Sequence, residues 1–160
     1  AKQALDRDRL LDMGYRAQAD ALVRLGNPSA AEASIGRALE ISKDFPKRTL
    51  SEERDAALRS AQAAMIAARL GKHAKAQQMI GPPLEFQRKL HLRGRGNDDQ
   101  TQRVEYALTL YASALASPAK ASGALKEAAA ILDGLPQEMR RLVSVTRLRN
   151  DIAEEQRKPR

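Results

Sequence analysis

The segment Arg24-Leu25-Gly26 decides the fold of this chain, because it returns 45 residues later as Arg69-Leu70-Gly71 and, in weaker form, after the same interval as Ala114-Leu115-Ala116. A ladder of apolar and small residues follows each copy: Ala31, Ile35, Gly36 and Leu39; then Ala76, Ile80, Gly81 and Leu84; then Ala121, Leu125 and Ala129. A fixed period of about 20 to 50 residues is typical of stacked supersecondary units. The sequence therefore predicts a repeat architecture and not an enzyme built around one pocket.

The composition favours one all-α domain. The chain of 160 residues is 42% hydrophobic and 30% charged, which suits a folded protein and not a disordered one. Only 3% of the residues are aromatic, so alanine supplies much of the apolar surface. Small side chains with high helix propensity allow helices to approach one another closely. We therefore expect a single helical-repeat domain over residues 1–160.

The apolar period predicts seven helices, at about 2–25, 28–45, 51–70, 72–90, 98–116, 118–133 and 136–157. The fourth contains Gly81-Pro82-Pro83, which does not fit a regular helix interior. We expect the helix to break there, with a separate turn over 84–90; the alternative is that it ends at Ile80. The segment 91–97 has two glycines and no apolar period, so it is the expected linker.

Local signals mark the ends of these helices. Gly26 and Gly71 are expected just after the first and third helices, where a left-handed residue commonly ends a helix. Asn27-Pro28 and Ser117-Pro118 combine an N-cap residue with proline at the first helical position. Ser51 is the expected N-cap of the third helix, and Asp98 or Asp99 that of the fifth.

The expected fold is an α-α superhelix of three helical hairpins. Its repeats cover about 1–45, 46–90 and 91–135, and a capping helix covers 136–157. An end helix of this kind covers the apolar face that the last repeat would otherwise expose. Its expected apolar face carries Met139, Leu142, Val145, Leu148 and Ile152.

The repeats resemble the tetratricopeptide repeat, in which helix A ends near a glycine and helix B carries two alanines seven residues apart. The residues that carry this resemblance are Tyr15, Ala19, Gly26, Ala31 and Ala38 in the first copy and Ser60, Ala64, Gly71 and Ala76 in the second. The period is longer than is usual for the family, and Pro83 stands where the second copy would carry its later alanine. The resemblance implies a right-handed stack whose A helices line a concave groove.

The resemblance also implies a set of groove residues. They are Met13, Arg16, Asp20 and Arg24 in the first repeat, Leu58, Ala61, Met65 and Arg69 in the second, and Arg103, Tyr106, Leu110 and Ala114 in the third. Because arginine holds carboxylates bidentately, such a groove suits a protein or peptide partner with acidic groups. The alternative is that the arginines are solvated and that Met65 and Leu110 belong to the core. The family's clamp for chaperone tails needs asparagine where Asp20 and Met65 stand, so we do not predict chaperone-tail binding.

The C-terminal part implies a biological context. The segment from Tyr106 to Pro136 looks like the C-terminal repeat regions of bacterial signalling proteins, which follow kinase or DNA-binding output domains. We therefore expect a piece of a larger bacterial regulatory protein, also because the chain begins with Ala1 and not Met. The chain contains no Cys, no membrane-spanning apolar run and no signal peptide, so a cytoplasmic location is expected.

No residues argue for catalysis, a metal or a cofactor. His73 and His91 lack further ligands at suitable spacing, and no phosphate-binding loop or nucleophile motif is present. The net charge of +8 and the basic stretch 88–95 keep nucleic-acid binding open as an alternative, although no aromatic residues interleave this stretch to stack on bases. Self-association through the last helix or the groove is a further alternative. We expect a non-enzymatic interaction module.

Overall fold

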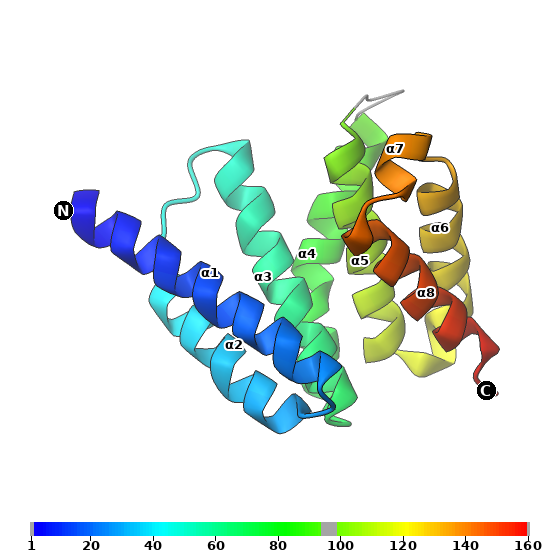
Figure 1. Cartoon of the computed structure of the whole chain (residues 1–160), viewed down its shortest axis with the longest axis horizontal. Helices are drawn as coiled ribbons and strands as arrows, with labels where there is room; N and C mark the ends of the chain where they lie inside the picture. Colours follow the sequence, from blue (N-terminus) through cyan, green and yellow to red (C-terminus); the bar gives the residue numbers. More distant parts are fainter. Residues whose placement is uncertain (1, 94–98, 160) are drawn as a thin grey trace.

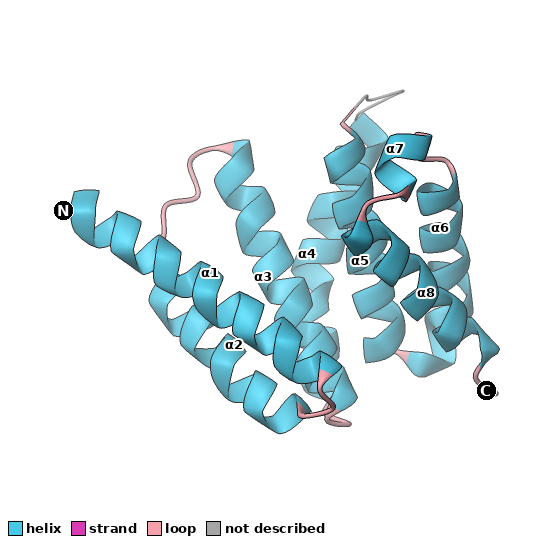
Figure 2. Ribbon diagram, in the orientation of Figure 1, coloured by secondary structure: helices cyan, strands magenta, loops and turns pink. Residues whose placement is uncertain are grey.

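The computed structural model describes residues 2–93 and 99–159, which form eight α-helices, one 3-10 helix and no strand. The α-helices are α1 (Lys2–Arg24), α2 (Pro28–Ser42), α3 (Leu50–Arg69), α4 (His73–Arg93), α5 (Gln100–Ala116), α6 (Ala121–Asp133), α7 (Gln137–Arg140) and α8 (Val143–Arg157), with η1 (Pro118–Lys120) before α6. In the described residues, Figure 2 shows helices joined by loops and turns. The expected all-α class is confirmed.

The first six α-helices form three pairs. Consecutive helices pack as α1 on α2, α3 on α4 and α5 on α6, and the pairs lie side by side in chain order (Figure 1). Neighbouring pairs are joined mainly where α3 meets α2 and α5, and where α4 meets α5. The last helix, α8, turns back to pack on α6 and on part of α5. None of the helices in the described part of the chain could span a bilayer.

Local capping explains several helix ends. Gly26 and Gly71 both adopt a φ of 74°, a left-handed conformation that glycine adopts without a Cβ penalty, as predicted. The Asn27 side chain accepts a hydrogen bond from the Ala30 amide at 3.2 Å, which confirms the cap of α2. Asp99 caps α5 by accepting from the Gln102 amide at 3.0 Å. The cap of α3 is Thr49 and not Ser51, because Thr49 and the glutamate three residues later form a reciprocal capping box.

The predicted break in the fourth helix is wrong, because α4 continues through Pro82 and Pro83. The residue before a proline is normally pushed out of the helical region by clashes with its amide and its Cβ, and Gly81 removes the Cβ clash. Beyond the prolines, Leu84 packs against the largest apolar cluster and Gln87 is fully buried. Tertiary packing on α5 therefore holds together a helix that its local sequence would interrupt.

The predicted linker 91–97 is only partly described. His91, Leu92 and Arg93 form the end of α4 and are therefore helical, contrary to expectation. Residues 94–97, together with the alternative cap Asp98, lie outside the described residues.

The single C-terminal helix expected over 136–157 is two helices. The short α7 ends at Arg140, and α8 begins at Val143. Leu142 lies in the turn between them with 47% of its surface exposed, so it does not join the apolar face on which it was expected. Val145, Leu148 and Ile152 do lie in the core, as predicted. The sixth helix, expected to begin at Pro118, is also divided. Pro118 is the first residue of η1, and α6 begins at Ala121.

The core consists of three apolar clusters of unequal size. The largest joins α5, α6 and α8 through large side chains such as Tyr106, Leu110, Leu125, Leu132 and Ile152. The cluster between α3, α4 and α5 consists almost entirely of alanines, with Ile80 as its one large fully buried residue. The third cluster joins α1 and α2 to α3. Alanine thus allows close approach of the helices, whereas bulky packing is concentrated toward the C-terminus.

Candidate binding cleft

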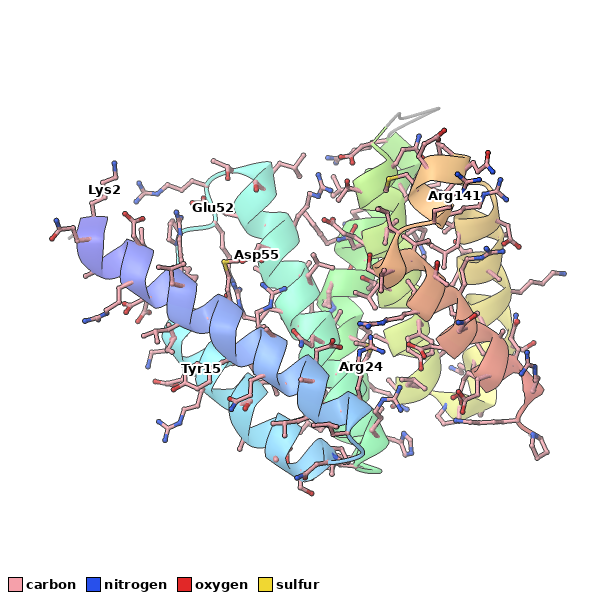
Figure 3. The ribbon with its side chains drawn as sticks, viewed as in Figure 1. Lys2, Tyr15, Arg24, Glu52, Asp55 and Arg141 are labelled. Atoms are coloured by element: carbon pink, nitrogen blue, oxygen red, sulfur yellow. The ribbon has the colours of Figure 1, made fainter. Side chains whose placement is uncertain are left out.

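A cleft of about 980 Å³ lies between α8 on one side and α1, α3 and α5 on the other. Figure 3 shows Arg24 near the C-terminal end of α1 and Asp55 in the first half of α3. The residues that line the cleft are Arg16, Asp20, Val23, Arg24, Leu58, Gln62, Met65, Ile66, Arg69, Val104, Leu108, Tyr111, Leu142, Val143, Ser144, Arg147, Leu148, Asp151, Glu154, Glu155 and Lys158. A volume of this size is at the upper end of the range for small-molecule pockets and suits part of a peptide.

The two ends of the cleft differ in polarity. The helices α3, α5 and α8 run in the same general direction in Figure 1, so residues early in each helix gather at one end. That end carries the apolar side chains of Leu58, Val104 and Val143 from the three helices and of Leu142 just before α8, with Ser144 and Arg147 of α8 beside them. The other end carries Asp20, Arg24, Arg69, Asp151, Glu154, Glu155 and Lys158. We call these parts the apolar end and the charged end.

The three arginines on the α1–α3 wall have different partners. Arg16 donates to the Asp55 carboxylate at 2.6 Å, and Arg24 pairs with Asp20 at 3.1 Å. Arg69 donates to the hydroxyl of Tyr111 at 3.0 Å, and no carboxylate of the described residues lies within ion-pair distance of it. Of the three, Arg69 is therefore the one whose charge is left for a ligand.

Burial and neighbouring charges both shift the pKa values of titratable groups at the charged end. Burial raises the pKa of Tyr111 to about 12, and the charges of Asp151, Glu154 and Glu155 act in the same direction while Arg69 opposes them. Burial also raises the pKa of Asp151 above its ordinary value, although the charges of Arg24 and Arg69 lower it. The nearby arginines thus compensate the ionised form of Asp151 only in part.

A buried ionic network supports the wall of the cleft from behind. Arg59 of α3 donates two hydrogen bonds of 2.8 Å to the carboxylate of Asp12 on α1, and both residues are almost fully buried. Asp55 accepts from both Arg59 and Arg16, so two arginines and two aspartates alternate across the α1–α3 contact. Arg59 also lies 5.6 Å from the centre of the Phe45 ring. This network fixes the orientation of Arg16 and the relative positions of the two helices.

Six of the predicted groove residues line the cleft: Arg16, Asp20, Arg24, Leu58, Met65 and Arg69. Met13 is 62% exposed on α1 and lies outside the cleft. Arg103 points elsewhere as well, since it donates to Gln100 and approaches Gly134 at the end of α6.

The groove residues that were expected on α5 do not line the cleft, because α8 packs over α5 and α6. Tyr106 and Leu110 are 1% exposed and belong to the same cluster as Val145 and Leu148 of α8. Ala61 and Ala114, which were also expected in the groove, are buried in apolar clusters. In place of these residues, α5 contributes Val104, Leu108 and Tyr111 to the cleft.

Sequence reasoning missed the α8 wall altogether. Arg147, Asp151, Glu154 and Lys158 recur at helical spacing on a different side of the helix from Val145 and Ile152, so a polar face of this helix was foreseeable. Which neighbour that face meets depends on how the chain turns between α7 and α8, and no local pattern specifies that turn.

The two histidines and the described part of the basic stretch lie outside the cleft. His73 is exposed at the start of α4, while the His91 ring lies 4.9 Å from that of Tyr106. In residues 2–93 and 99–159, no three His, Cys, Asp or Glu side chains are grouped so that they could hold a metal ion. In the basic stretch, Lys89 pairs with Glu85 at 2.6 Å, and residues 94 and 95 lie outside the described part.

Comparisons with protein family models, curated proteins and solved structures gave no match to this chain.

Proposed function

We propose that this protein is a non-enzymatic interaction module whose cleft holds a peptide or helical segment of a protein partner. The observation that carries the proposal is the cleft itself, which combines an apolar end with a charged end. Recognition of a protein segment by a groove uses this combination, because apolar anchors supply affinity and charged groups fix the register.

The proposal includes a tetratricopeptide-like superhelical stack within a larger bacterial regulatory protein. Repetition of contacts supports the stack. Arg9 and Arg54 stand 45 residues apart, and each pairs with an acidic residue at the start of the next odd-numbered helix, Arg9 with Glu52 at 3.0 Å and Arg54 with Asp99 at 2.9 Å. The two left-handed glycines, Gly26 and Gly71, have the same spacing.

Arg69 supports an acidic group in the partner. Its guanidinium donates only to a tyrosine hydroxyl in the described structure, so a carboxylate from the partner can pair with it without displacing an internal one. Arg16 and Arg24 already hold Asp55 and Asp20, so they are weaker candidates for this role.

The test is affinity capture from a nuclease-treated lysate with three baits: the natural chain, Arg69→Glu and Arg37→Glu. Arg37 is exposed on α2, takes part in no ion pair of the described residues and does not line the cleft, so it controls for the change of net charge. We expect a protein that the natural chain and Arg37→Glu retain and Arg69→Glu loses. Equal retention by all three baits would contradict binding in the cleft.

The same experiment separates the alternatives. If the only captured material requires intact nucleic acid and its retention falls steeply with salt, the basic surface is the binding site and the cleft is not. If the retained protein is a second copy of this chain, light scattering will show a mass that rises with concentration, and the module serves self-association.

A further inference from the structure

Two of the three carboxylates of α8 that line the cleft, Asp151 and Glu154, lack internal partners in the described structure. No hydrogen bond or ion pair of the described residues reaches Asp151 or Glu154. Asp151 is half-buried, so water compensates it only in part. Arg147 stands one turn earlier on the same helix and does not come within ion-pair distance of it.

Some of the charged side chains at the charged end pair with one another, and the others have no ion-pair partner in the described structure. Arg24 is paired with Asp20, and Lys158 with Glu155 at 2.6 Å. What remains is Arg69 on the α3 side and, on the α8 side, the two carboxylates Asp151 and Glu154 with Arg147 one turn before Asp151. Arg24 and Arg69 act on Asp151 from across the cleft without pairing with it. A partner carboxylate that pairs with Arg69 would take up one of these positive charges, so the α8 carboxylates would then attract a cation from the same partner.

We infer that the partner segment carries a basic side chain, lysine or arginine, that pairs with Asp151 and Glu154. This inference rests on the proposed function and specifies the partner: a peptide segment with an apolar anchor, an acidic group for Arg69 and a basic group for α8. The α8 carboxylates thereby determine specificity, since a purely acidic or purely apolar segment leaves them without a counter-ion.

The helix geometry sets the spacing of these groups. Val143 at the apolar end and Asp151 are eight residues apart on α8. At a rise of about 1.5 Å per residue their separation along the helix is roughly 12 Å. An extended peptide advances about 3.3 Å per residue, so its apolar anchor and its basic residue are roughly four positions apart.

The test is selection from a random 12-residue peptide library displayed on phage, using the purified full chain. The second bait is the isosteric double variant Asp151→Asn with Glu154→Gln, and the third is Arg69→Gln. A matched control, Asp6→Asn with Asp44→Asn, removes two exposed carboxylates outside the cleft that have no ion pair in the described structure.

On the natural chain and the matched control, we expect selected peptides enriched in both basic and acidic residues beside apolar ones. The α8 double variant should lose the enrichment in lysine and arginine only, and Arg69→Gln the enrichment in acidic residues only. A peptide selected on the natural chain should bind the α8 double variant about tenfold more weakly. Changing its lysine to glutamate should restore binding to an Asp151→Lys variant.

Two results would overturn the inference, and they are distinguishable. Cleft-dependent peptides without basic enrichment, or with basic enrichment that survives in the α8 double variant, would refute the role of Asp151 and Glu154 while leaving the cleft as a binding site. Failure to select any peptide that depends on Arg69 or on α8 would refute the proposed function as well.

Discussion

The buried pair of Asp12 and Arg59 offers the sharpest test of how α1 is held on α3. The perturbation is a double-mutant cycle of Asp12→Leu, Arg59→Met and both together, which replaces charged groups by apolar ones of similar volume. Each single change leaves one charge of the network uncompensated, because two arginines and two aspartates balance in the natural chain. The double change leaves Arg16 and Asp55 still paired at 2.6 Å.

The magnitude follows from burial. Asp12 and Arg59 are 2% and 4% exposed, so breaking the pair should cost the free energy of unfolding about 3–5 kcal/mol in each single variant. The double variant should be as stable as the natural chain or more stable by about 1–4 kcal/mol, since the desolvation of both charges is no longer required. In a chain of this size, each kcal/mol shifts the melting temperature by about 2–4 °C.

The assay is urea unfolding followed by far-ultraviolet circular dichroism, with the m-value checked for each variant. Asp133→Ala serves as a control, because it removes an exposed pair with Arg149 and should change stability by less than about 1 kcal/mol. Single variants that lose less than about 1 kcal/mol, or a double variant that loses the sum of the two single losses, would refute the reasoning.

Three further predictions concern individual positions. Asp151→Asn should raise the melting temperature at pH 7, because the raised pKa of Asp151 means that its ionised form is disfavoured in the folded state. The difference in melting temperature between the variant and the natural chain should disappear as the pH falls below the ordinary pKa of 3.8, where Asp151 is protonated in both the folded and the unfolded state. Gly26→Ala and Gly71→Ala should each lower the stability by about 1 kcal/mol, because both glycines have a positive φ. Gly36 lies in the interior of α2 with open space around it, so Gly36→Ala should raise the stability by about 0.5–1 kcal/mol. Thermal melts compare the three variants. Thr49→Ala removes the capping box of α3 and should cost about 1 kcal/mol in urea titration, while a loss below about 0.3 kcal/mol would show that the cap is dispensable.

The helix ends around Gly26 and Gly71 were predictable because their signals are local. Gly26 and Asn27 specify the end of one helix and the start of the next through backbone conformation and a nearby side chain, and both act within one turn. The α4 prediction failed for the opposite reason. The local rule against Pro82 and Pro83 was applied correctly, but packing of the following residues on α5 outweighs it, and that packing is between segments distant in sequence.

The cleft was predictable only on one wall. Arg16, Asp20 and Arg69 were expected from the resemblance to the tetratricopeptide repeat, and they line the cleft. The same resemblance misplaces Tyr106 and Leu110, because α8 packs over α5 and α6 and buries them. The opposite wall, with Asp151, depends on a turn at Arg141 and Leu142 that no periodic pattern encodes.

Because the three apolar clusters differ in size, the parts of the chain that they hold together should unfold locally with different free energies. The α1–α2 pair contacts the rest of the chain through an ionic network and the cluster with the fewest buried residues, whereas α5, α6 and α8 share the largest and bulkiest cluster. In proteins whose units contact only their neighbours, each unit opens with its own free energy. Amide hydrogens of α1 should therefore exchange with solvent fastest, and those of α5 slowest. Because α1 forms one wall of the cleft and α8 the other, a bound segment would contact both the least protected part of the molecule and the most protected part. Binding of the segment should therefore slow hydrogen exchange along α1.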